Sequence, residues 1–562
     1  MISILALLFV APPLLQSGGE PVVAAAAVDV AHVKTSKPAS NTLARLSPEA
    51  VDPELQVSPD GSYVVYRSSI EQLSSLRIRD GSRAVIAPPP ACSNMHSYFQ
   101  ISSDSRKVLF TCPAWTGVPT DLWAVPIEGP PSAALRLSLP ADAPYQLGPF
   151  YGEIVKSRFF YHLPHIDPFR IDLYSVPVDG PPDAGTVINA PLSQGTQTAN
   201  AVPLPLTSRV LYLEWNWPKI SSIWSAAPDG SRAVRIAVSP ASHPITSGFL
   251  VSPNEQRVVW YAHNDLERFW LYSATISDPA GSPTQLNLDL PPDRSVGPAV
   301  ISPDSTRVAF LANQDSSSRM DLYSIPIDGP PAIAINLSEL TQPWYPEVGG
   351  VQFSDDSASI YYVGDLEIEG RYDLYRVPTE GPASAAVRIN PVDAQTWSVD
   401  KPSQIPGTND VLFELIRTGP GQPTRCFRGD LLGGTGTATP LWSIDLQRNN
   451  NSVNCRWLPE SGSVLFVSYG DSSASSTLWL AHGSGPPDSL PKKLLDSGEF
   501  EFPNDPFWRG DLTPTPDGRY LVYSGKPLGS EDGVWLRPLP YFWDGFESGG
   551  TGHWTEAAGD QP

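Results

Sequence analysis

Positive charge is scarce in this chain of 562 residues: 37 Lys and Arg residues stand against 59 Asp and Glu residues, for a formal net charge of −22. Nucleic-acid binding depends on Lys and Arg side chains that neutralise phosphates. Anionic membrane surfaces likewise attract polybasic segments. The acidic balance therefore argues against both kinds of partner.

Long apolar runs and helical patterns are also lacking. The apolar stretch at residues 4–10 is too short to span a membrane, and no other segment approaches the length of a transmembrane helix. With the small residues at 23–27 it indicates a secretory signal peptide, although no Lys or Arg precedes it. An ordinary unstructured amino end is the alternative. We therefore expect an exported bacterial protein, periplasmic or extracellular (secreted), without a transmembrane segment in the mature chain.

Cysteine is rare, and its spacing does not match a metal site. The sequence contains no Cys-x-x-Cys and no Cys beside a His. In an exported chain an even number of cysteines in local pairs favours disulfides. We predict one disulfide between Cys92 and Cys112 and a second between Cys426 and Cys455, each joining neighbouring repeats.

Two short phrases recur about every 45 to 50 residues. The first is a turn of the Ser-Pro-Asp-Gly type followed by an apolar run, and it or a variant of it begins at residues 58, 102, 252, 302, 354 and 515. The second resembles Asp-Leu-Tyr-x-Val-Pro-x-Asp-Gly-Pro-Pro and begins at residues 121, 172, 321 and 373. A period of this size made of short strands is typical of a propeller. We predict an all-β fold, a β-propeller of four-stranded blades with roughly eight to ten repeats.

Each repeat is predicted to contain four strands. The second strand is the apolar run, buried between neighbouring blades, and the short fourth strand after Gly-Pro-Pro forms the outer edge. Proline near the end of the second phrase has no amide for the ladder, so we expect it at a strand end or a bulge. On this template ten repeats begin near residues 55, 97, 147, 200, 248, 298, 350, 402, 454 and 511, the third, fourth, eighth and ninth being degenerate.

The chain is expected to divide into four parts. Residues 1–27 form the signal peptide, 28–50 a linker whose last part supplies a closing strand, 51–540 the propeller and 541–562 a tail. A radial array can use such a length as one unit. The repeats close either as one large ring or as a smaller ring with an extra partial sheet.

The turn, the apolar strand and Asp-Leu-Tyr together resemble the WD40-like (PD40) repeats of TolB-type propellers, which also form the propeller of prolyl oligopeptidase relatives. The resemblance covers residues 50–540. The Trp that usually precedes the turn is replaced here by Val57, Ile101, Val251, Ile301 and Phe353, which leaves the subfamily open. The resemblance implies protein binding at the central mouth. Residues 542–554 resemble an ending found on many exported bacterial proteins.

Catalytic motifs are absent from the sequence. Peptidase relatives of such propellers carry a nucleophilic Ser in Gly-x-Ser-x-Gly, and this sequence has no such motif. It also has no glycine-rich phosphate loop, His-Glu-x-x-His or EF-hand spacing. A peptidase is therefore not expected, and neither is a cofactor.

Histidine offers one candidate metal site. His162 and His165, with Asp167, form His-x-x-His-x-Asp in an expected loop of the third repeat, where His263 or His96 could assist. Some propeller lyases that act on uronate sugars use a metal held by histidines. A pair of solvated loop histidines is the alternative.

Two sets of repeated side chains are predicted to have structural roles. Asp residues of the turns are predicted to cap them, and the Asp that opens each second phrase is predicted to accept an amide of the neighbouring blade. One aromatic residue per repeat is predicted to pack between blades. Four aromatics outside this pattern, on expected loops, are the candidate binding residues: Trp215, Trp217, Trp344 and Tyr345.

These observations favour a non-catalytic exported β-propeller that binds a protein or envelope component, as a TolB-like protein-binding or scaffold module. The alternative is a metal-dependent polysaccharide lyase or hydrolase on a propeller. A third hypothesis is a structural surface or sensor protein whose tail handles sorting. The ligand and the oligomeric state do not follow from the sequence.

Overall fold

The computed structural model describes part of the chain, and all structural statements concern that part. The described residues are 44–45, 55–69, 72–88, 99–112, 121–137, 154–155, 157–166, 169–181, 184–216, 219–238, 245–263, 269–276, 283–291, 294–315, 319–338, 347–391, 397–417, 425–434, 438–441, 453–459, 462–469, 476–482, 492–496, 500–501, 512–527 and 533–539. The predicted signal peptide (1–27) and tail (541–562) lie outside them.

Strands account for nearly all regular structure, because the apolar runs are short and are bounded by turn residues. The described residues contain no α-helix, only the 3-10 turns η1 (Pro131–Ala133), η2 (Pro331–Ile333) and η3 (Ala383–Ala385). None of the described segments forms a helix that is long and apolar enough to cross a membrane.

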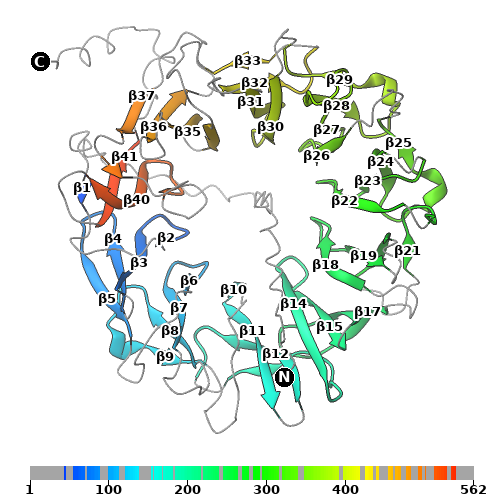
Figure 1. Ribbon diagram of the computed structural model, residues 1–562. Coiled ribbons are helices and arrows are strands. Elements are labelled where there is room, and N and C mark those ends of the chain that lie inside the picture. Colours follow the sequence, from blue (N-terminus) through cyan, green and yellow to red (C-terminus); the bar gives the residue numbers. More distant parts are fainter. Residues whose placement is uncertain are drawn as a thin grey trace, which may run out of the picture. The chain divides into compact units, whose positions relative to one another are not determined.

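Ten successive groups of strands form blades, numbered here 1 to 10, which follow one another around a ring (Figure 1). Blade 1 contains β2 (Leu55–Val57), β3 (Tyr63–Ser69), β4 (Gln72–Arg77) and β5 (Arg83–Ala87), and blade 2 contains β6 (Phe99–Ile101), β7 (Lys107–Cys112), β8 (Asp121–Pro126) and β9 (Leu135–Arg136). Blade 3 contains β10 (Ile154–Val155), β11 (Arg158–Ile166), β12 (Phe169–Pro177) and β13 (Thr186–Val187), and blade 4 contains β14 (Thr196–Leu204), β15 (Arg209–Asn216), β16 (Lys219–Ala226) and β17 (Val234–Val238). Blade 5 contains β18 (Ile245–Val251), β19 (Arg257–His263), β20 (Phe269–Thr275) and β21 (Thr284–Gln285).

The remaining blades repeat this order. Blade 6 contains β22 (Val296–Ile301), β23 (Arg307–Ala312), β24 (Asp321–Pro326) and β25 (Ile335–Asn336), and blade 7 contains β26 (Val348–Phe353), β27 (Ser359–Gly364), β28 (Asp373–Pro378) and β29 (Val387–Arg388). Blade 8 contains β30 (Trp397–Gln404), β31 (Asp410–Arg417), β32 (Arg425–Asp430) and β33 (Thr439–Pro440), and blade 9 contains β34 (Val453–Leu458), β35 (Ser463–Tyr469), β36 (Ser476–His482) and β37 (Lys492–Asp496). Blade 10 contains β38 (Phe500–Glu501), β39 (Leu512–Pro514), β40 (Tyr520–Pro527), β41 (Gly533–Pro538) and β1 (Ala44–Arg45). The predicted all-β propeller of four-stranded blades is confirmed, with ten blades.

The amino-terminal strand closes the last blade. Ala44 of β1 pairs with Leu536 of β41, and Arg45 pairs with Trp535. Blade 10 also packs on blade 1, because Val522 belongs to the apolar cluster that contains Leu55. Strands far apart in the sequence thus join the two ends of the array, as expected of residues that precede the propeller.

The core lies between blades. The second strand of each blade is buried on both faces, as the three successive residues Val308, Ala309 and Phe310 show. Val308 and Phe310 pack toward blade 5, whereas Ala309 packs toward blade 7. A residue of either face is therefore removed from water, which explains the continuous apolar runs of the sequence.

Proline ends the third strand wherever the second phrase contains it. This position is the last residue of β8, β12, β24 and β28. The expectation of a strand end is correct, since a residue without an amide donor is tolerated where the ladder stops.

The turn between the first and second strands also links neighbouring blades. A serine with φ between 61° and 66° occupies a place that Gly61 and Gly518 hold in blades 1 and 10. The serine hydroxyls accept backbone amides from the turn of the preceding blade, at 3.0 Å each: Asp60 N to Ser105, Asn254 N to Ser305 and Asp304 N to Ser357. These bonds offset the strain of a positive φ at a residue with a side chain.

Candidate functional site

A buried aspartate organises the start of the third strand in several blades. In blade 3, Asp172 accepts hydrogen bonds from Arg170 Nε at 2.8 Å and from Asn189 Nδ2 at 2.9 Å. The amide oxygen of Asn189 accepts the Leu173 amide at 2.6 Å. We call this arrangement the Arg–Asp–Asn clasp. It lies within one blade, so the prediction that these aspartates bind the neighbouring blade is wrong.

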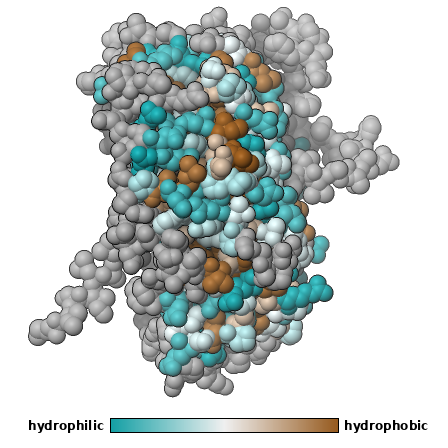
Figure 2. Space-filling model, turned by 90° about the vertical axis from the view of Figure 1, so that its right-hand side faces the viewer, coloured by the Kyte–Doolittle hydropathy of each residue, from teal (hydrophilic) through white to brown (hydrophobic). Residues whose placement is uncertain are grey.

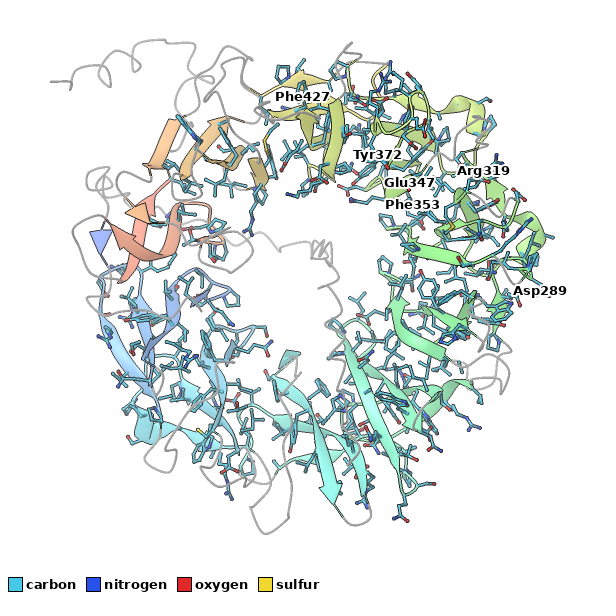
Figure 3. All side chains as sticks on the ribbon, in the orientation of Figure 1. Asp289, Arg319, Glu347, Phe353, Tyr372 and Phe427 are labelled. Atoms are coloured by element: carbon cyan, nitrogen blue, oxygen red, sulfur yellow. A yellow bond between two sulfur atoms is a disulfide. The ribbon has the colours of Figure 1, made fainter. Side chains whose placement is uncertain are left out.

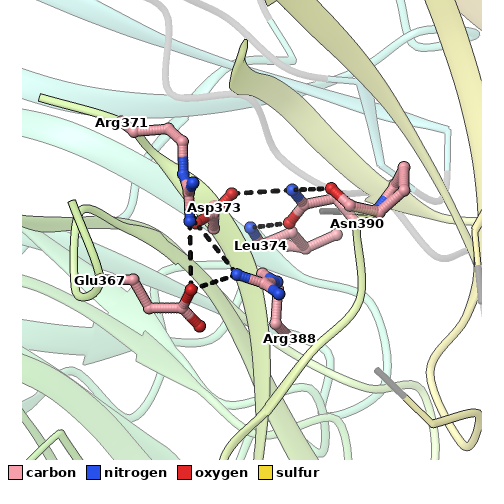
Figure 4. Close-up of polar contacts among 7 residues, drawn as sticks. Glu367, Arg371, Asp373, Leu374, Arg388 and Asn390 are labelled. Atoms are coloured by element: carbon pink, nitrogen blue, oxygen red, sulfur yellow. Dashed lines mark hydrogen bonds and ion pairs between the residues drawn. The ribbon is translucent and has the colours of Figure 1, made fainter. Parts of the chain in front are cut away.

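Blade 7 repeats the clasp and adds charge to it (Figure 4). Asp373 Oδ2 accepts Arg371 at 2.7 Å, and Asp373 Oδ1 accepts Asn390 Nδ2 at 2.8 Å. Glu367 Oε2 binds Arg371 at 3.1 Å and also binds Arg388. Both guanidinium groups are buried, whereas Glu367 is 47% exposed. The cluster thus exposes the Glu367 carboxylate to solvent, while two buried arginines hold it in place.

A second exposed carboxylate of blade 7 is Glu347. Tyr372 donates its hydroxyl to Glu347 Oε2 at 2.7 Å, and this hydrogen bond raises the pKa of Tyr372 to about 12. Figure 3 shows Glu347 and Tyr372 side by side. Asp365 Oδ1 accepts the Glu347 amide at 2.6 Å, and Asp365 Oδ2 accepts the Gly370 amide at 3.1 Å. Asp365 therefore fixes the segment before β26 against the loop between β27 and β28.

The arrangement is suited to binding a cation. Glu347 and Glu367 each present a carboxylate on blade 7, and each is held by a polar contact with a neighbouring side chain. Oε1 of Glu347 and Oε1 of Glu367 have no hydrogen-bond partner among the described residues, which leaves both as acceptors. Charge-assisted hydrogen bonds of this kind are the strong ones.

The sequence contained a signal for this site that the repeat analysis missed. Arg precedes Asp by two residues at Arg170, Arg319 and Arg371, each time at the start of the third strand. Glu347 and Glu367 lie outside the repeated phrases. Only the folded blade brings Glu347 to Tyr372 and Glu367 to the two arginines.

The predicted metal ligands do not converge. His162 and His165 lie on β11, not in a loop, and their spacing of three residues directs their side chains to opposite faces of the strand. His165 Nε2 lies 3.0 Å from Asp172 Oδ2, within the clasp of blade 3. Asp167 lies outside the described residues. Where the structure describes the chain, no three His, Cys, Asp or Glu side chains could hold a metal together.

His162 instead joins blade 3 to blade 4. Thr198 donates its hydroxyl to the Ile171 carbonyl at 2.9 Å, so its oxygen accepts the hydrogen bond from His162 Nδ1 at 2.9 Å. This network assigns the ring proton to Nδ1. Burial lowers the pKa of His162 to about 4.

The His162→Gln variant is expected to be less sensitive to acid than the unmodified protein. Between pH 6.5 and about 4 the unfolded histidine binds a proton and the folded one does not, so the free energy of unfolding falls as the pH decreases. One such group contributes up to about 1.4 kcal/mol per pH unit. Urea unfolding at several pH values measures the slope, and an unchanged slope in the variant would contradict this assignment.

Of the four predicted aromatic binding residues, one is described. Trp215 lies within β15, paired with Gln197 and Ile220, rather than on a loop. Trp217, Trp344 and Tyr345 lie outside the described residues. Their binding role stays a prediction.

The repeated aromatic residues pack in pairs within each blade. In blades 3 to 9 the aromatic of the third strand stacks on one from the second strand, with ring centroids 5.5 to 6.3 Å apart. Tyr323 on Phe310 is an example, at 5.5 Å. These pairs stabilise the blade and also join the clusters between blades.

A disulfide joins blades 8 and 9. Cys426 of β32 is bonded to Cys455 of β34, with their Cα atoms 6.4 Å apart. Cys112 of β7 is also disulfide-bonded. Its predicted partner, Cys92, lies outside the described residues.

Exposed apolar side chains are scattered. Figure 2 shows small apolar groups separated by polar residues on the viewed face. The large exposed apolar residues among those described are spread over six blades: Val187, Leu206, Val238, Leu288, Ile333, Ile368 and Leu432. Single residues of this kind do not define a contact surface.

Solved structures that are similar to this chain include three peptidases. No protein-family model matches it. No curated protein sequence matches it either. A prolyl endopeptidase is 11% identical with a TM-score of 0.36, and the match covers 68% of this chain and 55% of that one. Dipeptidyl peptidase 4 of Porphyromonas gingivalis is 10% identical with a TM-score of 0.46, and the match covers 91% of this chain and 68% of that one. A puromycin-hydrolysing peptidase of Mycobacterium tuberculosis is 12% identical with a TM-score of 0.31, and the match covers 68% of this chain and 61% of that one. The chain thus spans 55% to 68% of these proteins, and at such identities the likeness concerns the fold alone.

The predicted function is corrected by this comparison. The three similar structures are all named as peptidases, not as binding or scaffold modules.

Proposed function

We propose that this propeller serves peptide hydrolysis, as the part of a peptidase that receives the peptide and holds its cationic group. The observation that carries the proposal is the pair of exposed carboxylates in blade 7, Glu347 and Glu367. Peptides present a cation at a free amino terminus and at Lys and Arg side chains. A carboxylate fixed in advance by a tyrosine or by arginines binds such a group with little loss of side-chain entropy.

The charge of the whole chain supports the same ligand class. A net charge of −22 attracts cations from a distance, and salt screens this attraction. Within the site, Asp365 and the clasp of Asp373 hold the loop and the buried arginines in one geometry. The proposed roles are therefore direct binding for Glu347 and Glu367, and positioning for Tyr372, Arg371 and Arg388.

The Glu347→Gln variant is expected to weaken the binding of a tripeptide with a free amino terminus by about 10- to 100-fold, the usual loss for one hydrogen bond to a charged group. Isothermal titration calorimetry would measure the affinity, with the acetylated tripeptide as the reference ligand. Glu380→Gln is the matched control, because Glu380 lies after β28, at the opposite end of the third strand.

The outcomes are separable. Weaker binding of the free tripeptide only in Glu347→Gln supports the proposal. Equal affinity for the free and acetylated tripeptides, or no binding and no hydrolysis of any tripeptide by the unmodified chain, would reject it.

The proposal also includes the location of the protein and the class of its repeats. The apolar stretch at residues 4–10 and the Cys426–Cys455 disulfide support a periplasmic or extracellular location, where disulfides persist. The two repeated phrases support assignment of the blades to the TolB-type, WD40-like class. Fractionation of cells that express the full chain would test its location.

A further inference from the structure

Three polar side chains form one row across blade 7. Tyr362 of β27 pairs directly with Tyr375 of β28, and Tyr375 pairs with Arg388 of β29. Direct cross-strand partners lie on the same face of a sheet. Both tyrosines belong to the apolar cluster that contains Leu311 and Leu322, so the row faces blade 6.

Each member of the row is buried and has an unsatisfied polar atom. Tyr362 is 0% exposed, Tyr375 is 5% exposed and Arg388 is 8% exposed. The two hydroxyls and Arg388 Nε have no hydrogen-bond partner among the described residues. An orphaned buried polar group costs about 1–3 kcal/mol. Three of them in one row indicate that a further group satisfies them.

The neighbouring blade shows which kind of group fits there. The corresponding row in blade 6 is Phe310, Tyr323 and Asn336. Asp315 accepts hydrogen bonds from both polar members, at 2.6 Å from the Tyr323 hydroxyl and 3.1 Å from Asn336 Nδ2. An anion from the loop between the second and third strands therefore satisfies this row.

In blade 7 the corresponding loop carboxylate, Glu367, binds arginines and not the tyrosine hydroxyls of the row. Glu367 lies three residues after the end of β27, as Asp315 lies three residues after the end of β23. Glu367 binds Arg371 and the terminal nitrogen Nη1 of Arg388 instead of Tyr375. The row of blade 7 thus consists of hydrogen-bond donors, and the carboxylate at the position of Asp315 does not accept from its hydroxyls.

We propose that blade 7 binds a small inorganic anion of the halide class, such as chloride, between Tyr362, Tyr375 and Arg388. The two tyrosine rings are stacked on one face of the blade, with their centroids 5.7 Å apart, so one ion could contact both side chains. Burial also raises the pKa of both tyrosines, so the hydroxyls stay protonated as donors.

A water molecule is a poorer match than an anion. Water accepts at most two of the three hydrogen bonds that the row can donate, and within the row its own hydrogens find only the tyrosine hydroxyl oxygens as acceptors. An anion accepts all three. Arg388 places a positive charge at one end of the row, while its terminal nitrogen pairs with Glu367 in the adjacent cluster.

The test replaces gluconate by chloride at constant ionic strength and follows thermal unfolding of the full chain. Chloride and bromide are expected to raise the unfolding midpoint by about 1–2 °C, because a ligand that binds only the folded state stabilises it. Tyr375→Phe removes one donor and should abolish the rise. Tyr323→Phe is the matched control and should retain it, because the Tyr323 hydroxyl is held by Asp315.

Crystallography with bromide provides an independent measurement. An anomalous peak within hydrogen-bonding distance of both hydroxyls would confirm the site even if Tyr375→Phe does not fold. A water at that position would overturn the proposal. So would a rise with formate but not with halides, or a chloride effect that persists in Tyr375→Phe. None of these outcomes depends on peptide binding, so the inference is independent of the proposed function.

Discussion

Replacing Asp373 by alanine is expected to lower the free energy of unfolding by about 3–5 kcal/mol, the usual loss when one partner of a buried ion pair is removed. Asp373 is 2% exposed. Its carboxylate holds the Arg371 guanidinium and the Asn390 amide, both of them buried. The variant removes the carboxylate that the buried Asn390 amide donates to, and it leaves the buried Arg371 guanidinium with Glu367 alone. Urea unfolding followed by tryptophan fluorescence would measure the change.

The matched control is Asp328→Ala in blade 6. Asp328 is 64% exposed and pairs with Arg257 at 3.4 Å. An exposed ion pair contributes at most about 1 kcal/mol, so this variant should retain nearly all of its stability. A loss of stability of similar size in both variants would show that the clasp contributes no more to the free energy of unfolding than an exposed ion pair does. Asp373→Ala should also weaken peptide binding, because Arg371 positions Glu367.

Removing the disulfide by the double change Cys426→Ala and Cys455→Ala is expected to lower the free energy of unfolding by about 3.5 kcal/mol. The two cysteines are separated by 29 residues, and a cross-link of that span limits the entropy of the unfolded chain by this amount. The tie joins the third strand of blade 8 to the first strand of blade 9. Its loss should therefore be most visible as easier opening between these blades, measured by hydrogen exchange.

The comparison is made without reductant, since Cys112 is also disulfide-bonded. The Glu414 carboxylate still accepts the Cys455 amide at 3.1 Å, so the blades keep a polar contact in the variant. Unchanged unfolding in the double variant would mean that blade packing alone holds this junction. A loss of protection in all blades would mean that the ring opens as a unit.

Several features followed from the sequence because they depend on local chemistry. Proline at residue 326 ends a strand because it has no amide donor, and this needs no tertiary contact. Asp304 caps its turn because its carboxylate reaches the Thr306 amide two residues on, at 3.0 Å. The apolar run at residues 307–312 is buried because both of its faces meet another blade. The degenerate ninth repeat begins where the period indicates, since β34 starts at Val453.

Other features depended on contacts between distant residues. His162 and His165 are close in the sequence, but strand geometry separates their side chains, so no metal centre forms from these two. Glu347 and Tyr372 are 25 residues apart and meet only through the pairing within blade 7. The serines of the turns looked like spacers, yet their hydroxyls bond the turns of the preceding blades.

The sequence by itself determined the repeat, its four strands and the blade interfaces, because strand period, turn chemistry and apolar burial act over a few residues. The tertiary structure decided which polar side chains come together: the clasp around Asp373, the exposed carboxylates beside it and the donor row of Tyr362, Tyr375 and Arg388. Such groups are drawn from separate strands and loops, and burial fixes their partners only after the blades have packed.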